Sequence, residues 1–295
     1  MRRDNRPDFC KTSDKIPGGN PASLPRTAYL PINRCNLPAV ILGSLTYQTH
    51  PVPLELDGVR ALHRDLFARL DAISETECRA EVFRDYMTVH FRLEHLEEAG
   101  LTRTNTERAN ANYMTMICGW HFDSNEREGA AMKGWVESRF GLLPRYHGKT
   151  LREAGSEAHR RYLEMRAQGL YGTNALEAQL DIVYTYCQYE FARQMPNTRH
   201  LTLYRGVNRL TEFEHLPECA NPDPHRAGAR VLLFNNLNSL TSNRDRADEF
   251  GDIILTVEVP VAKILFHCHL LPGILRSEDE YLAIGGVYRV QCATF

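Results

Sequence analysis

The hydrophobic pattern of the chain changes its period near Pro196, and this change restricts the folds open to it. Between residues 54 and 194, apolar side chains recur three or four positions apart, which is typical of amphipathic helices. After Pro196, β-branched and aromatic residues form short runs, which predict strands. The runs lie at 201–207, 230–234, 253–259 and 281–290. The sequence therefore predicts an α+β fold with a helical first part and a β-rich end.

The same pattern divides the 295 residues into three parts. Residues 1–53 are rich in Pro, Asn and Arg and show no helical period, so we expect an irregular N-terminal arm. Residues 54–195 form the predicted helical region, and 196–295 form the predicted β-rich part. The chain is long enough to bury a large hydrophobic core.

Charge and cysteine content bear on partners and compartment. The 35 Lys and Arg against 37 Asp and Glu leave a formal net charge of −2, so electrostatics favours neither nucleic acid nor an anionic membrane. The longest apolar runs, such as 253–261, are interrupted and far too short to insert into a bilayer. No apolar stretch follows the first residues, and the eight cysteines form no Cys-x-x-Cys pair. We therefore expect a cytoplasmic protein that neither binds nucleic acid nor enters a membrane.

Two carboxylates, Glu278 and Glu280, stand two residues apart in the acidic run that precedes the last predicted strand. On an extended backbone such residues point the same way. One carboxylate could stabilise a developing positive charge, while its neighbour, with a raised pKa, accepts a proton from a nucleophile. In isolation the pair is better explained as solvated turn residues.

Two other features precede this acidic pair. Tyr204, Arg205 and Gly206 end a predicted strand, where the Arg205 guanidinium suits a phosphate or nearby carboxylates and Gly206 lets a ligand approach the backbone. A later segment, 235–242, carries hydroxyl groups that could bond a ribose or orient a carboxylate. A short helix ending near Phe250 is predicted to follow it.

The sequence contains neither a strong metal-binding motif nor a nucleotide-binding motif. On a strand, His267 and His269 would put two imidazoles on one face, but no third ligand is nearby in the sequence, and ordinary strand alternation explains the spacing. We therefore expect no metal site. The chain has no Gly-x-Gly-x-x-Gly or Walker motif, so a nucleotide would not be bound at a helix N-terminus as in a dehydrogenase.

The order of these elements resembles that of a known enzyme family. Tyr204-Arg205-Gly206, the hydroxyl-bearing segment and Glu278-Asp279-Glu280 are similar to the Arg, Ser-Thr-Ser and Glu-x-Glu elements of arginine-specific mono-ADP-ribosyltransferases. Segments 119–123, 134–140 and 280–289 further resemble the dinitrogenase reductase ADP-ribosyltransferases. The chain departs from the pattern by reading Ser-Leu-Thr-Ser. Which hydroxyl replaces the family serine is therefore open among Ser239, Thr241 and Ser242.

The resemblance implies a fold and an activity. The implied fold is the ADP-ribosyltransferase split β-sandwich, preceded here by a helical region, with 196–295 as the NAD+-binding catalytic core. Members of the family cleave NAD+ and attach ADP-ribose to one arginine of dinitrogenase reductase, the iron protein of nitrogenase. This modification inactivates the iron protein and switches off nitrogen fixation. The resemblance also suggests a PII-type regulatory protein as a partner.

Residue roles follow from the same resemblance. Glu280 would be the catalytic glutamate, positioned by Ser239 or Thr241, and Glu278 would receive the target guanidinium. Gly206 would bond the nicotinamide amide through its backbone. The residues expected to bind NAD+ are Tyr204, Arg205, Gly206, Ser239, Thr241, Ser242 and Phe250.

The chemistry of the two glutamates agrees with these roles. Cleavage of a glycosidic bond to a cationic leaving group passes through an oxocarbenium-like state, which a fixed carboxylate such as Glu280 stabilises. A guanidinium is a poor nucleophile because its pKa is above about 12, so it needs a nearby base such as Glu278.

Two other functions fit the same residues. A NAD+ glycohydrolase would use water as the acceptor, and protein labelling would distinguish it from a transferase. A non-catalytic NAD-sensing regulator would bind its partner without releasing nicotinamide.

Overall fold

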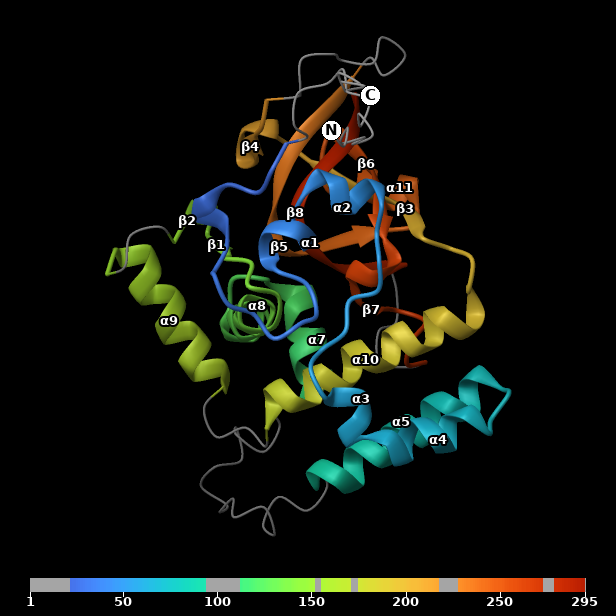
Figure 1. Cartoon of the computed structure of the whole chain (residues 1–295). Coiled ribbons are helices and arrows are strands. Elements are labelled where there is room, and N and C mark those ends of the chain that lie inside the picture. Colours follow the sequence, from blue (N-terminus) through green and yellow to red (C-terminus); the bar gives the residue numbers. More distant parts are fainter. Residues whose placement is uncertain are drawn as a thin grey trace, which may run out of the picture.

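A computed structural model describes residues 22–93, 112–151, 155–170, 175–217, 228–272 and 279–294 of the chain (Figure 1). Its helices are α1 (Ala39–Leu42), α2 (Leu45–Thr49), α3 (Val59–Leu62), α4 (Arg64–Asp71), α5 (Thr76–Phe91), α7 (Tyr113–Phe122), α8 (Arg127–Phe140), α9 (Glu157–Leu170), α10 (Leu176–Gln194) and α11 (Arg244–Asp248). Its strands are β1 (Arg145–Tyr146), β2 (Lys149–Thr150), β3 (His200–Val207), β4 (Glu214–His215), β5 (Ala229–Thr241), β6 (Ile253–Pro260), β7 (Ile264–His267) and β8 (Glu280–Thr294). Short 3-10 helices lie at Arg26–Ala28, Leu210–Glu212 and Val261–Lys263.

The larger sheet is antiparallel and is organised around β8. The first half of β8 pairs with β7 and its second half with β6, while β5 runs along its other edge. Strand β3 pairs with β6 along its whole length and meets β5 at the single pair Tyr204–Thr241. Strands β5 and β6 lie on either side of β8, and β3 connects β6 back to β5. The end of β5, the start of β8 and the middle of β3 therefore lie together.

Helix α10 joins the sheet to the outer helices. In Figure 1 it crosses beside β7 and separates the strands from α4 and α5. The Gln188 amide donates to the carbonyls of Val261 and Ile264 at 3.1 and 2.8 Å, and the Tyr184 hydroxyl donates to Ala262 at 2.8 Å. Buried polar groups need hydrogen-bond partners. These bonds supply them both for the side chains of α10 and for the carbonyl groups at and just before the start of β7.

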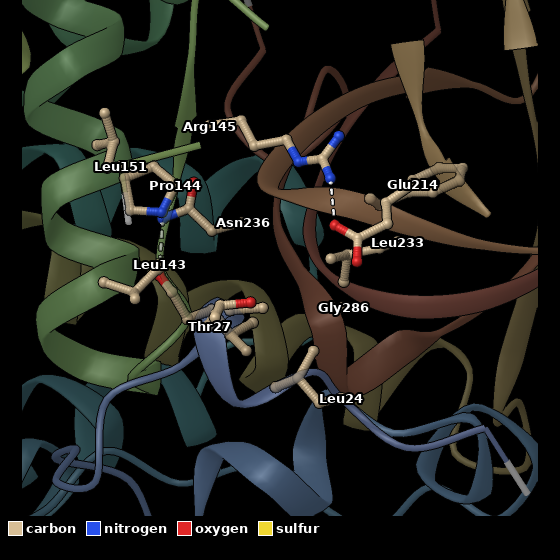
Figure 2. A pocket seen from close by; sticks show the side chains of 13 residues that line it. Leu24, Thr27, Leu143, Pro144, Arg145, Leu151, Glu214, Leu233, Asn236 and Gly286 are labelled. Carbon is tan, nitrogen blue, oxygen red and sulfur yellow. Dashed lines mark hydrogen bonds and ion pairs between the residues drawn. The ribbon is translucent and has the colours of Figure 1, made fainter. Parts of the chain in front are cut away.

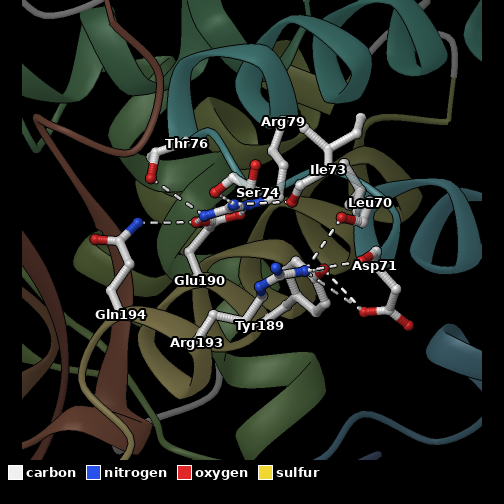
Figure 3. A network of polar contacts seen from close by, with 10 residues as sticks. All are labelled: Leu70, Asp71, Ile73, Ser74, Thr76, Arg79, Tyr189, Glu190, Arg193 and Gln194. Atoms are coloured by element: carbon white, nitrogen blue, oxygen red, sulfur yellow. Dashed lines mark hydrogen bonds and ion pairs between the residues drawn. The ribbon is translucent and has the colours of Figure 1, made fainter.

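A buried ion pair ties α5 to α10 (Figure 3). Arg79 donates from Nε and Nη2 to the two carboxylate oxygens of Glu190, each at 2.7 Å. Its remaining donors reach the carbonyls of Ile73 and Ser74 and the hydroxyl of Thr76. The side chains of Arg79 and Glu190 are 3% and 1% exposed, so the pair is fully desolvated and fully bonded.

The chain before residue 54 takes part in the core. Where the sequence predicts an irregular arm, residues 39–49 form α1 and α2, and the Gln48 side chain bonds the backbone of Glu258 on β6 and Arg289 on β8. Figure 2 shows Leu24 beside a small pocket whose lining also includes Arg145 of β1 and Leu233 of β5. There Arg145 Nη2 meets Glu214 Oε2 at 2.8 Å and links β1 to β4.

The α+β class expected from the sequence is confirmed, as are the predicted strands that became β3, β5, β6 and β8. Strands β1, β2, β4 and β7 were not among the predicted runs, because the first three have two residues each and β7 is a short apolar run without alternation. One hydrophobic core runs from Leu24 to Val290 and includes residues of both the helical and the β-rich parts. Among the described helices, none combines the length and the apolar character that a bilayer crossing needs.

Candidate active site

Three strands place the candidate residues in one row. Tyr204 on β3 pairs with Thr241 on β5, and Thr241 pairs with Glu280 on β8. Opposed residues of an antiparallel pair share a face of the sheet. The strand closure at β3 therefore gathers residues that lie up to 76 positions apart in the sequence.

The Glu280 carboxylate stands at the β8 end of this row. Glu280 is 7% exposed, and both of its oxygens have a partner. Oε1 accepts from the Ser239 hydroxyl at 2.5 Å, and Oε2 lies 3.1 Å from His121 Nδ1. Because a carboxylate only accepts, His121 Nδ1 carries the proton in this contact. The two bonds, which come from different elements, hold the carboxylate in one orientation.

Helix α7 supplies the second layer of contacts. Trp120 donates from Nε1 to the Ser239 hydroxyl at 2.8 Å, so this hydroxyl accepts from Trp120 and donates to Glu280. The helix begins at Asn112, whose side chain accepts from Thr115 N at 3.1 Å. Trp120 is 4% exposed, and this burial fixes the indole against β5.

Arg205 lies next to the carboxylate. Its Nη1 donates to the Ser239 carbonyl at 2.9 Å, while its Nε is buried and has no hydrogen-bond partner among the described residues. Burial lowers the pKa of Arg205, whereas the charges of Glu212 and Glu280 raise it. The guanidinium keeps its charge because its ordinary pKa is above about 12. A buried charged donor without a partner is suited to an anionic group of a ligand.

Close packing against α11 requires a glycine at position 206, and the sequence did not predict this contact. A Cβ at this position would lie 1.8 Å from the Ala247 carbonyl oxygen of α11. The glycine lets α11 pack directly on β3, and Asn243 caps that helix by accepting from Asp245 N at 3.0 Å. This contact sets the position of α11, which forms one wall of the site.

A pocket opens beside these residues. It has a volume of ≈ 180 Å³, and Tyr204, Gly206, Thr241, Phe250 and Glu280 are among the residues that line it. A second hollow of ≈ 320 Å³, which includes Trp120 and Asn238, adjoins it. Both hollows share His121, Arg205 and Ser239. The two together offer room for a ligand that extends past the Glu280 carboxylate.

The structure separates the three alternative hydroxyls. The Ser239 hydroxyl bonds Glu280 directly. Thr241 lies opposite Glu280 in register, but its hydroxyl accepts from Asn243 N at 3.1 Å. The Ser242 side chain interacts with Tyr281. Of the three, Ser239 makes the contact that a positioning residue needs.

The second glutamate of the acidic pair, Glu278, lies outside the described residues. Asp279 has a φ of 48°, so the backbone is not extended between Glu278 and Glu280. The expectation that a continuous strand aligns the two carboxylates was therefore wrong. A turn residue in the left-handed region interrupts the period on which that expectation rested.

Trp120 and His121 contact the site although no role for them is predicted from the sequence. Both lie in the Gly119–Asp123 segment that resembled the family, and this was the only signal that could have marked them. Their contacts with Ser239 and Glu280 join residues 119 and 159 positions apart. Periodicity within one element cannot predict such contacts.

Comparisons with known proteins agree with the resemblance. The family model for dinitrogenase reductase ADP-ribosyltransferase matches residues 32–292. A NAD(+)--dinitrogen-reductase ADP-D-ribosyltransferase of Rhodospirillum rubrum is 37% identical over 269 residues, which are 88% of this chain and 94% of that protein. No solved structure matches the chain. The chain therefore belongs to the dinitrogenase reductase ADP-ribosyltransferase family.

Proposed function

We propose that this protein transfers ADP-ribose from NAD+ to one arginine of dinitrogenase reductase and thereby switches off nitrogen fixation. The observation that carries the proposal is the buried Glu280 carboxylate, held by Ser239 and His121 beside Arg205. The name of the R. rubrum relative supports NAD+ as the donor and dinitrogenase reductase as the target. The closure of β3 on β5 supports an ADP-ribosyltransferase split β-sandwich as the fold.

Glu280 has the environment that the first step requires. As the nicotinamide leaves, positive charge develops on the ribose, and a carboxylate that is already oriented stabilises that charge without reorganising. The bonds from Ser239 and His121 supply this orientation. Burial strengthens the interaction because water does not screen it.

Glu278 would act on the acceptor. A protonated guanidinium must lose a proton as it attacks the ribose, and a carboxylate close to Glu280 in the chain can accept it. This role distinguishes a transferase from a hydrolase, because water needs less help than an arginine side chain.

The site also fits NAD+. The buried and unpartnered Arg205 Nε suits a phosphate or ribose oxygen. Tyr204, Gly206 and Phe250 line the adjoining pocket, and the Phe250 side chain offers a face on which a planar ring could stack. Thr241 also lines this pocket, and Ser242 follows it in the chain; both would complete the binding residues.

The proposed reaction places the enzyme in the cytoplasm, together with NAD+ and the iron protein. A PII-type regulatory protein as a further partner rests on the family resemblance alone.

The test is incubation of the purified protein with labelled NAD+ and purified dinitrogenase reductase, followed by mass spectrometry of the labelled residue. We expect ADP-ribose on a single arginine. Nicotinamide release without protein labelling would identify a NAD+ glycohydrolase, and NAD+ binding without nicotinamide release would identify a non-catalytic regulator.

Glu280→Gln keeps the shape of the side chain but removes its charge. We expect a loss on the order of 10²-fold or more in both transfer and NAD+ hydrolysis, with NAD+ binding retained in calorimetry. Glu278→Gln is the matched variant, and we expect it to abolish arginine labelling while slow hydrolysis continues. Near-normal turnover of Glu280→Gln, or equal loss of both activities in Glu278→Gln, would contradict this division of roles.

A further inference from the structure

Three potential metal ligands meet where β7 ends and β8 begins. Cys268 Sγ, a ring nitrogen of His269 and a carboxylate oxygen of Asp279 all lie within 4.8 Å of one another. His269 Nε2 and Asp279 Oδ1 are 3.5 Å apart. Asp279 directly precedes β8, at the other end of the chain segment that joins the two strands. It lies ten positions after His269, so spacing along the sequence did not predict it as a ligand.

His267 does not belong to this group. It is 7% exposed, and its ring packs between Phe191 and Tyr281, at centroid distances of 5.0 and 5.6 Å. The His267–His269 pair suggested by the sequence is therefore not a metal pair. The residues whose ligand atoms lie close to His269 in the tertiary structure are Cys268 and Asp279.

The donor set favours zinc among the common divalent ions. Thiolate, imidazole and carboxylate are its usual protein ligands, whereas magnesium and calcium prefer oxygen alone. Ligand atoms on one tetrahedral zinc ion lie about 3.5 Å apart. His269 and Asp279 already have this spacing, and the Cys268 thiol needs to approach them by about an ångström at most, which the His269 side chain allows because it is 68% exposed.

The backbone already holds the ligands in place. Cys268 N donates to the Glu280 carbonyl at 3.0 Å, and Ser242 N donates to the Asp279 carbonyl at 3.2 Å. Cys268 is buried, but His269 and the Asp279 carboxylate, which is 43% exposed, reach solvent. An ion therefore reaches these ligands from solvent, which can also supply water as a fourth ligand.

We propose that Cys268, His269 and Asp279 bind one Zn2+ ion, and that this ion inhibits the enzyme. Coordination converts the Cys268 thiol to a thiolate and releases its proton to solvent. Asp279 separates Glu278 from Glu280 in the chain, so the ion fixes the residue between the two glutamates. It also adds positive charge beside a site that must stabilise positive charge, which raises the barrier. Only this inhibitory effect rests on the proposed function.

Binding is tested first, without any activity measurement. The full chain is titrated with Co2+, whose thiolate complexes absorb in the near ultraviolet, and then with Zn2+ against a coloured chelator. We expect one equivalent bound with a thiolate band. Cys268→Ser should abolish the band, and His269→Ala and Asp279→Asn should each weaken Zn2+ by about tenfold or more.

Cys78→Ser is the matched control, because Cys78 is an exposed thiol on α5 outside the cluster. It should bind metal like the unaltered protein. An undiminished band in Cys268→Ser, or an affinity that none of the three substitutions changes, would overturn the site.

Inhibition is tested with the same variants. We expect Zn2+ to lower ADP-ribose transfer at least about tenfold in the unaltered protein and in Cys78→Ser, but not in Cys268→Ser. Chelation should restore the rate. Zinc that binds at this site and leaves transfer unchanged would overturn the inhibitory role, and it would leave both the proposed function and the measured binding intact.

Discussion

The Glu280 carboxylate is held by donors that come from two separate elements. Ser239 reaches it from β5 and His121 reaches it from α7, while Trp120 bonds the same Ser239 hydroxyl. Hydrogen bonds to a charged group contribute about 1.5 to 3 kcal/mol each. A bond of this strength is enough for the Ser239 hydroxyl to hold the Glu280 carboxylate in one orientation.

Ser239→Ala removes the hydroxyl between Trp120 and Glu280. We expect the transfer rate to fall by about 10- to 100-fold while the KM for NAD+ changes little, because the group lost orients the carboxylate. Steady-state kinetics at varied NAD+ measures the two separately.

Thr241→Ala and Ser242→Ala serve as controls, since their hydroxyls contact Asn243 and Tyr281 instead of Glu280. They should keep most of the rate at saturating NAD+, because their proposed part is to bind NAD+ and not to orient Glu280. If Thr241→Ala lowered it more than Ser239→Ala, the assignment of Ser239 as the positioning residue would be wrong.

Among the helices and strands, the buried ion pair between α5 and α10 determines how the outer helices attach to the sheet. Arg79 and Glu190 are 111 positions apart and almost without solvent contact (Figure 3). Gln194 also donates to Glu190 at 2.8 Å. Removing one partner of such a pair leaves the other charge buried and uncompensated.

Glu190→Gln should lower the free energy of unfolding by about 3 to 5 kcal/mol, because Arg79 then lacks a counter-charge in a dry environment. Urea denaturation followed by circular dichroism measures this change. Glu249→Gln is the control, since its pair with Arg246 is exposed, and it should cost less than about 1 kcal/mol. Equal effects of the two substitutions would show that burial of the pair has no energetic consequence.

At the scale of the whole molecule, the site is shared between the helical and the β-rich parts. Trp120 and His121 on α7 contact Ser239 and Glu280 on the sheet, and one hydrophobic core includes both parts. Residues 196–295 thus contain the larger sheet but not α7, whose Trp120 and His121 help to orient the Glu280 carboxylate.

We expect the fragment 196–295 to bind NAD+ poorly and to unfold without a sharp transition, because it exposes the face of β7 that α10 covers. Calorimetry and thermal unfolding compare it with the full chain. Co-expression with residues 1–195 should restore binding. A fragment that unfolds cooperatively and binds NAD+ as tightly as the full chain would contradict this expectation.

The sequence by itself determined the α+β class, the helical character of the first part, the four longest described strands, and the membership of a family through Arg205, Glu280 and the hydroxyl-bearing segment. These features depend on periodicity and on residue order, which are local. Only the tertiary structure selected Ser239 among three hydroxyls, added His121, and brought Cys268 close to Asp279. Strand register and helix docking decide such contacts, because they join residues whose separation along the chain carries no period.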